Sequence, residues 1–102
     1  MRVLFLSGAQ AQLKSIHTCI ARDNAEAASA VIARVEMVAE FLGENRGTGY
    51  KLPGGRLRRF PMRSFPYLIY DEVSGETVQI VRVCYAALFR RAFHEAVYAL
   101  QR

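Results

Sequence analysis

The sequence predicts a small α+β domain in which an N-terminal strand leads into an α-helical hairpin, packed on a three- to four-stranded antiparallel sheet, with a helix closing the chain. Apolar residues recur at helical spacing through the first half, whereas two short runs rich in β-branched and aromatic residues, 65–70 and 77–83, stand in the second. A chain of 102 residues, 52% of them hydrophobic, can form one core without disulfides or metal. A single domain over residues 1–102 is therefore expected.

The first half of the chain predicts one strand and two helices. Residues 2–6 read Arg-Val-Leu-Phe-Leu, which is typical of a strand. Ser7 follows as a helix N-cap, because its hydroxyl can accept a hydrogen bond from a free amide of the first turn. A second helix is expected to start near Asp23, whose spacing to Glu26 fits a capping box, and to end at Gly43. Only a residue or two separates the helices, so we expect an antiparallel hairpin.

The second half predicts an antiparallel meander and a last helix. Residues 45–55 are rich in glycine and proline and predict a loop, but without the strand before and helix after that a nucleotide-binding loop requires. The runs 65–70 and 77–83 flank a Ser-Gly turn and predict a β-hairpin. From about residue 86 to 100, apolar residues at helical spacing predict the closing helix. The helical hairpin should bury its apolar stripe on one face of this sheet.

Positive charge is concentrated in the middle of the chain. The net charge is +5, yet no Asp or Glu lies between Asn45 and Tyr70. Because the arginine fork suits carboxylate and phosphate, this segment favours an acidic partner, either nucleic acid or an acidic protein segment. A solvated basic face is the alternative. The positive residues of the segment are Arg46, Lys51, Arg56, Arg58, Arg59 and Arg63.

Several kinds of site are disfavoured. Cys19 and Cys84 lie in apolar patterns far apart, without metal-ligand spacing, so we expect two buried thiols in a reducing cytosol and neither metal nor other cofactor. His17 is isolated on the expected polar face of a helix and is a poor candidate catalyst. No apolar stretch approaches the roughly 20 residues that span a bilayer. A soluble, cytoplasmic protein is expected.

Motifs in the second half follow one another in an order that resembles a known family. Gly55-Arg56 is followed by Arg59-Phe60-Pro61, then by Phe-Pro-Tyr-Leu-Ile-Tyr at 65–70 and Val-Gln-Ile-Val-Arg-Val at 78–83. Together with the opening strand and the helical hairpin, these motifs resemble the RelE/ParE superfamily of type II toxins. The likeness is greatest to the ParE branch of plasmid stabilisation toxins.

The resemblance implies a partner and a target. Such toxins are held inactive by a cognate antitoxin, here ParD-like, whose disordered acidic C-terminal arm folds onto the toxin in a hetero-oligomer. For the ParE branch the implied target is DNA gyrase, which the toxin inhibits without being an enzyme. We expect the arm to cross the helical hairpin and the exposed sheet, pairing acidic residues with arginines and apolar anchors with apolar side chains. The residues predicted to bind it are Leu13, Ile16, Arg56, Arg58, Arg59, Phe60 and Arg63.

Three other functions fit parts of the sequence. A ribosome-dependent mRNA endonuclease of the RelE type would hold the scissile phosphate and move protons with Arg59, Arg63, Arg82 and Tyr85. Against it, Tyr67 stands where the RelE branch commonly carries an arginine. Cys84-Tyr85-Ala86 departs from the Leu-His-Gly usual in ParE-like chains, which leaves open a silent relative that only binds antitoxin. A basic nucleic-acid-binding module has the charge but lacks interleaved exposed aromatic residues or a named motif.

Overall fold

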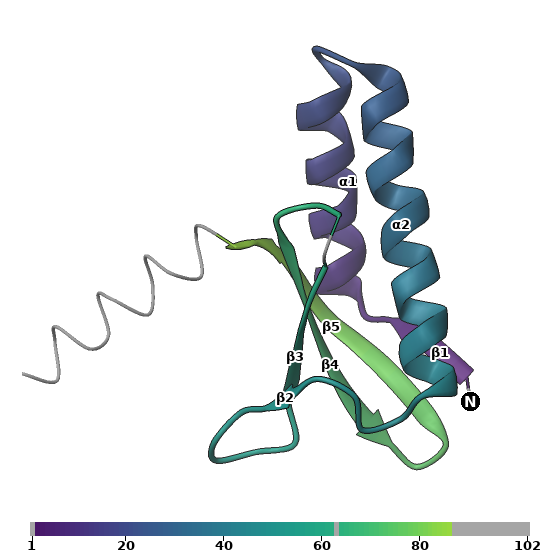
Figure 1. Cartoon of the computed structure of the whole chain (residues 1–102), viewed down its shortest axis with the longest axis vertical. Coiled ribbons are helices and arrows are strands. Elements are labelled where there is room, and N and C mark those ends of the chain that lie inside the picture. Colours follow the sequence, from purple (N-terminus) through teal and green to yellow (C-terminus); the bar gives the residue numbers. More distant parts are fainter. Residues whose placement is uncertain (1, 63, 87–102) are drawn as a thin grey trace, which may run out of the picture.

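The computed structural model describes residues 2–62 and 64–86, and these form two helices and five strands (Figure 1). Arg63 lies outside the described residues, and so does the predicted closing helix apart from its first position. Neither described helix is both long and apolar enough to cross a bilayer. In chain order the elements are β1 (Arg2–Phe5), α1 (Ser7–Ala21), α2 (Ala25–Glu44), β2 (Tyr50–Lys51), β3 (Arg58–Pro61), β4 (Tyr67–Ser74) and β5 (Thr77–Tyr85).

The strands form one mixed sheet in the order β1-β5-β4-β3-β2. The α+β class and the helical hairpin on a sheet are confirmed, but the sheet has a fifth strand and is not wholly antiparallel. β1 pairs in parallel with β5, from Arg2 opposite Thr77 to Phe5 opposite Ile80. Several elements and their loops separate β1 from β5 along the chain, so no turn sequence sets their relative direction. β2 is only two residues long and lies inside the segment predicted to be a loop.

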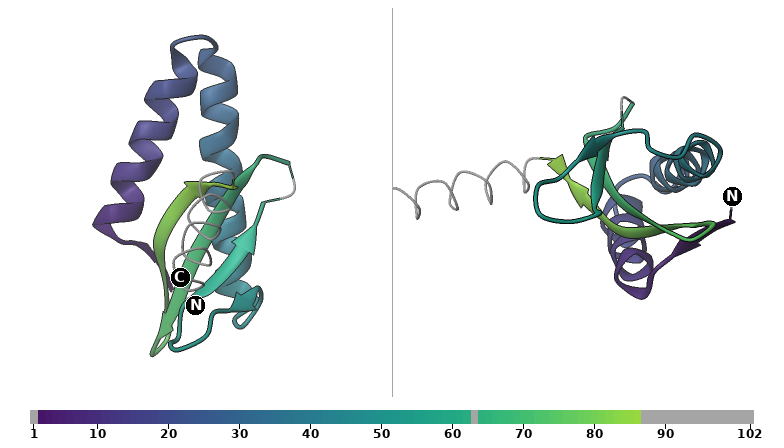
Figure 2. Two further views of the ribbon diagram at one scale, coloured as in Figure 1. Left: turned by 90° about the vertical axis from the view of Figure 1, so that its left-hand side faces the viewer. Right: turned by 90° about the horizontal axis from the view of Figure 1, so that it is seen from below.

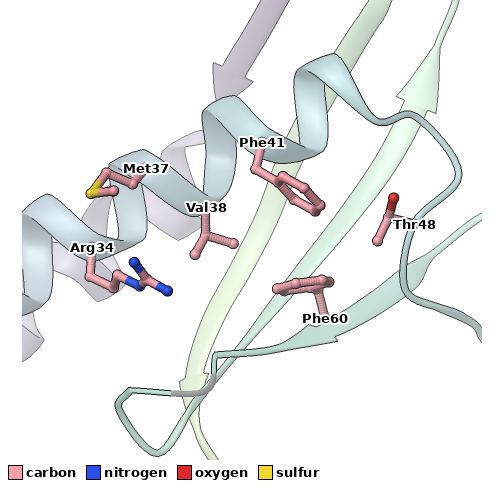
Figure 3. Close-up of a pocket in the computed structure, with 6 residues that line it drawn as sticks. All are labelled: Arg34, Met37, Val38, Phe41, Thr48 and Phe60. Carbon is pink, nitrogen blue, oxygen red and sulfur yellow. The ribbon is translucent and has the colours of Figure 1, made fainter.

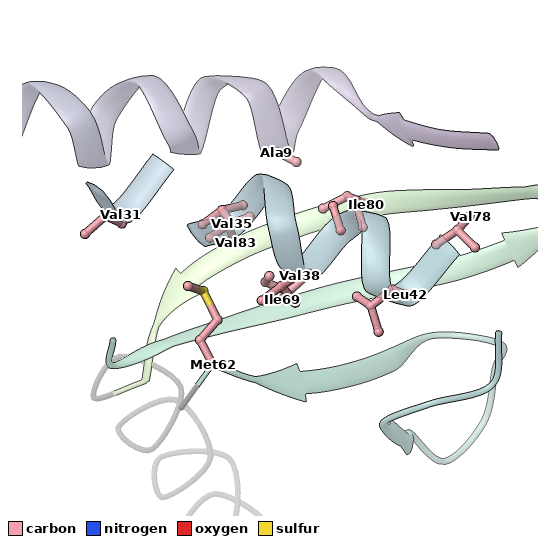
Figure 4. Packing of buried hydrophobic residues seen from close by; sticks show 11 residues of the cluster. Ala9, Val31, Val35, Val38, Leu42, Met62, Ile69, Val78, Ile80 and Val83 are labelled. Atoms are coloured by element: carbon pink, nitrogen blue, oxygen red, sulfur yellow. The ribbon is translucent and has the colours of Figure 1, made fainter. Parts of the chain in front are cut away.

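Both described helices pack on the same face of the sheet, and no helix within residues 2–62 and 64–86 covers the opposite face, here named the open face (Figure 2). α2 supplies most of the helical side of the core, because its buried residues recur every three to four positions along one stripe. Ala9 is the buried residue that α1 contributes. Figure 4 shows this packing, in which the α2 residues Val31, Val35, Val38 and Leu42 meet the strand residues Ile69, Val78, Ile80 and Val83.

The helix ends differ in detail from the sequence prediction. Ser7 is the first residue of α1 and makes no cap, because Leu6 occupies the N-cap position without a side-chain hydrogen bond. The amide of Asp23 donates to the carbonyl of Ile20 at 3.1 Å, so Asp23 lies in the turn that follows α1. The cap of α2 is Asn24, whose Oδ1 accepts from the Ala27 amide at 3.0 Å. Gly43 is buried inside α2, which continues to Glu44.

Candidate functional site

An apolar groove separates α2 from β3 on the helical side of the sheet (Figure 3). It has a volume of about 530 Å³. The rings of Phe41 and Phe60 both line it and are in tilted contact, with centroids 6.0 Å apart. Met37 is 58% exposed and Phe41 44% exposed, which is unusual for large apolar side chains that stand together. The groove is therefore a candidate surface for apolar side chains of a partner.

The groove follows from the spacing of residues on α2 and β3. Val38 belongs to the buried stripe of α2, whereas Met37 and Phe41 lie beside that stripe at helical spacing. On β3, Phe60 is paired with Ile69 of the core and so faces the helices. Because β3 lies near the edge of the sheet, the stripe of α2 does not cover Phe60 fully. The uncovered ring and the flank of α2 form the two walls.

One end of this groove carries a cation with an unsatisfied donor. Arg34 lines the groove, and its Nε is buried without a hydrogen-bond partner within the described residues. A buried donor left unsatisfied costs about 1–3 kcal/mol, so an acceptor supplied by a ligand there would be favourable. Beyond the other end, past Thr48, a smaller basic hollow is lined by Arg46, Gly47, Lys51, Arg56, Arg58 and Val73.

The arginines predicted to form one patch are divided between two faces of the sheet. Arg56 pairs with Glu72 at 3.4 Å between Nη2 and Oε1. Arg58 faces the helices and donates from Nη1 to the Gly47 carbonyl at 3.1 Å. Its neighbour Arg59 points to the open face, as the alternation of side chains along a strand requires. Arg56 and Arg58 therefore line one basic hollow, whereas Arg59 belongs to a different surface.

The predicted apolar contacts on α1 lie away from the α2–β3 groove. Leu13 is half-buried and packs against the core. Ile16 lines a second apolar groove of about 560 Å³ between α1 and β5, together with Cys19 and Tyr85. Of the predicted apolar anchors, Phe60 alone lines the α2–β3 groove, while Met37 and Phe41 were missed. Their signal was present in the sequence, since an apolar α2 residue next to the buried stripe needs a further contact.

The prediction of two buried thiols is wrong for Cys19. Cys19 is exposed and Cys84 is half-buried, and both are free. Cys19 continues the apolar spacing of α1, but it lines the groove between α1 and β5 and stays exposed there. The helical hairpin also projects beyond the sheet near its turn (Figure 1). His17 is exposed, as predicted. Within residues 2–62 and 64–86, no group of three or more His, Cys, Asp or Glu side chains could hold a metal ion.

The residues proposed for an endonuclease do not meet at one point. Arg59 and Arg82 lie on the open face, on either side of Tyr70 in the strand pairing. Tyr85 faces α1 instead, with its ring 5.8 Å from that of Tyr67, its partner across the β4–β5 ladder. An odd number of positions separates Arg82 from Tyr85, which places them on opposite faces. Arg63 is outside the described residues.

Comparisons with known proteins agree with this architecture. A helical hairpin on one face of a five-stranded sheet is a fold that this chain shares with a solved protein of a ParDE toxin–antitoxin system. The chain belongs to the ParE family, since the family model described as "ParE toxin of type II toxin-antitoxin system, parDE" matches residues 3–87. The predicted resemblance is thus confirmed.

A solved structure supports the fold independently. A chain from the "Chromosomal ParDE TA system from P. aeruginosa" superposes with a TM-score of 0.73 and 20% sequence identity. The match covers 83% of this chain and 95% of that one. No curated protein matches the sequence.

Proposed function

We propose that this ParE-family toxin inhibits DNA gyrase and is neutralised by a ParD-like antitoxin whose acidic, amphipathic arm binds in the α2–β3 groove. The observation that carries the proposal is the exposed apolar groove with Arg34 at one end and a basic hollow beyond the other. An arm with apolar side chains for the groove and carboxylates for its ends matches this surface in both polarity and charge.

The contacts proposed for the arm differ in part from those expected from the sequence. Apolar anchors pack on Met37, Phe41 and Phe60, and a carboxylate or carbonyl accepts from Arg34. Acidic residues further along the arm reach Arg56 and Arg58. The groove that Ile16 lines is a second contact surface for a longer arm.

Inhibition of gyrase rather than cleavage of mRNA is supported by family membership and by the separation of Tyr85 from Arg59 and Arg82. The toxin acts in this proposal by contact, without a cofactor and without being an enzyme, in the cytoplasm where gyrase works. A supercoiling assay with the purified chain tests it, and inhibition should be relieved by the antitoxin encoded beside it. Toeprinting on translating ribosomes tests the endonuclease, since new cleavage ends there would overturn the proposal.

The groove itself is tested by a matched pair of substitutions on α2. Phe41→Glu places a carboxylate in the groove and should weaken antitoxin binding by more than about tenfold, which corresponds to about 1.4 kcal/mol. Ser29→Glu introduces the same charge at an exposed position of α2 that does not line the groove, and it should leave affinity within about twofold. Equal affinities for the two variants, measured by calorimetry, would place the arm elsewhere. Binding of antitoxin without inhibition of gyrase would identify a silent relative.

A further inference from the structure

The open face of the sheet carries a row of alternating tyrosine and arginine across four strands. Tyr50 of β2 pairs with Arg59 of β3, Arg59 pairs with Tyr70 of β4, and Tyr70 pairs with Arg82 of β5. The sequence neighbours of Arg59, Tyr70 and Arg82 face the helices; these neighbours are Phe60, Ile69 and Val83. Because side chains alternate along a strand, the row lies on the opposite face of the sheet. We call these four residues the Tyr-Arg row.

The members of the Tyr-Arg row lie close together, and Tyr70 near its middle is 7% exposed. The Arg59 guanidinium carbon lies 5.9 Å from the centroid of the Tyr50 ring, which is cation–π geometry. Burial raises the pKa of Tyr70, while the positive charges of Arg59 and Arg82 oppose that shift, as expected for a hydroxyl between two guanidinium groups. Adjacent strands are about 4.8 Å apart, so the two arginine backbones are separated by roughly 10 Å.

The surroundings of the Tyr-Arg row suit an anionic, partly aromatic ligand. Tyr50 is 70% exposed, and Arg82 is exposed at the other end of the row. The carboxylate of Glu72, two residues along β4 from Tyr70, is engaged by Arg56 at 3.4 Å. Beside Tyr50 and Arg59 the same face carries a shallow apolar hollow of about 400 Å³, whose lining includes Pro61, Pro66 and Leu68.

We propose that the open face of the sheet binds a single nucleic-acid strand, with phosphates on Arg59 and Arg82 and a base stacked on the exposed face of Tyr50. Single strands are commonly bound by a basic surface with interleaved aromatic side chains, because phosphates pair with arginines while unpaired bases stack on the rings. The inference is binding without cleavage, since the tyrosine proposed as a proton carrier, Tyr85, lies on the opposite face. It goes beyond gyrase inhibition and does not depend on it.

A nucleic-acid strand fits the Tyr-Arg row better than an acidic protein segment does. Carboxylates would pair with the two arginines but would leave the exposed ring of Tyr50 without a role. The apolar α2–β3 groove on the other face already offers an amphipathic acidic arm its anchors. A duplex presents its phosphates but keeps its bases stacked inside, so a single strand should bind more tightly than a duplex.

Fluorescence anisotropy with the purified full-length chain tests this inference. The probe is a labelled oligothymidylate of about 12 nucleotides, within the usual range of such sites. Tyr50→Ala should weaken binding about tenfold without changing the salt dependence, whereas Tyr50→Phe should bind like the wild type. Arg82→Ala should reduce the slope of log affinity against log salt by about 0.7, the value for one phosphate contact on a single strand.

Arg22→Ala is the matched control, because it removes one exposed positive charge at the helical turn, far from the Tyr-Arg row in the fold. It should leave affinity within about twofold and the salt slope unchanged. The inference is overturned if the oligothymidylate does not bind at about 50 mM salt, or if Arg22→Ala loses as much affinity as Arg82→Ala. It is also overturned if a labelled polyglutamate peptide binds more tightly than the oligothymidylate and depends in the same way on Tyr50 and Arg82. None of these outcomes bears on gyrase inhibition or antitoxin affinity.

Discussion

Asp71 of β4 lies directly opposite Arg58 of β3, yet its carboxyl group is held without a close ion pair among the described residues. Asp71 is 3% exposed, and its Oδ1 is buried without a hydrogen-bond partner there. Burial raises the pKa of Asp71, while Arg58 and the residue's own backbone amide act in the opposite direction. The protein therefore keeps a carboxyl group at a position where its charged form is disfavoured.

Asp71→Asn should change how stability depends on pH. The unfolded chain loses this proton near the ordinary pKa, 3.8, and the folded chain loses it at higher pH, so the wild type becomes less stable as pH rises through that window. The neutral amide removes this loss. Asp71→Asn should therefore be more stable relative to the wild type at pH 7 than at pH 3. Urea unfolding at both pH values measures the difference in the free energy of unfolding between Asp71→Asn and the wild type. Glu72→Gln, at a partly exposed neighbouring position, is the control. The same difference at pH 3 and at pH 7 for Asp71→Asn would contradict the prediction.

Gly49→Ala should destabilise the junction between the loop and β2. Gly49 has φ +97°, and an added Cβ would lie 2.9 Å from the carbonyl oxygen of Arg59, a backbone atom that cannot simply move aside. We expect a loss of about 1–3 kcal/mol in the free energy of unfolding. Gly55→Ala is the control, because Gly55 has no positive φ and nothing within 4 Å of the new Cβ. Similar midpoints for both variants in denaturant would show that the turn tolerates a side chain.

Asn24→Ala should cost about 0.5–2 kcal/mol, because it removes the acceptor for the Ala27 amide at the start of α2. Asp23→Ala should cost less than about 0.5 kcal/mol, because the Asp23 side chain is exposed and does not cap the helix. Thermal unfolding of the two variants separates the observed cap from the one predicted from capping-box spacing. A larger loss in Asp23→Ala would reverse the assignment.

Leu42→Ala and Met37→Ala should separate stability from recognition on α2. Leu42 is 1% exposed in the core, so its truncation should cost about 2–5 kcal/mol. Met37 is exposed, so its truncation should change stability by less than about 0.5 kcal/mol, while antitoxin binding weakens. Unfolding in denaturant and calorimetric titration of the same two samples provide both readings. Loss of stability in Met37→Ala would mean that the groove is part of the core.

The local elements of this fold were predictable from the sequence, but the pairing of distant strands was not. The helical hairpin and the β4–β5 hairpin follow from apolar spacing and a Ser-Gly turn. The parallel pairing of β1 with β5 has no local signal, because it depends on how the whole chain packs. The grouping of arginines failed for a related reason: Arg58 and Arg59 are adjacent in sequence, and adjacent residues in a strand face opposite sides.

The candidate sites show the same division between local and distant information. Phe60 was predicted as a contact from its motif, whereas Met37 and Phe41 join the candidate groove only when β3 lies beside α2. Tyr50 and Arg59 lie nine positions apart in the sequence, and Tyr70 and Arg82 lie further along the chain. They alternate across strands, and the strand register alone brings Tyr70 and Arg82 into the same row. A reading along the chain cannot find a pattern that runs perpendicular to it.

The position of β1 beside β5 has a consequence for how the protein is made on the ribosome. The helical hairpin can form early from local contacts, but the valines of α2 gain their cover only when β4 and β5 have emerged. β1 can pair only after β5 has been synthesised, although β1 itself is synthesised first. A nascent chain stopped before Thr77 would therefore present unprotected apolar surface to chaperones and proteases. Interrupted synthesis should thus yield fragments that are cleared rather than partly active toxin.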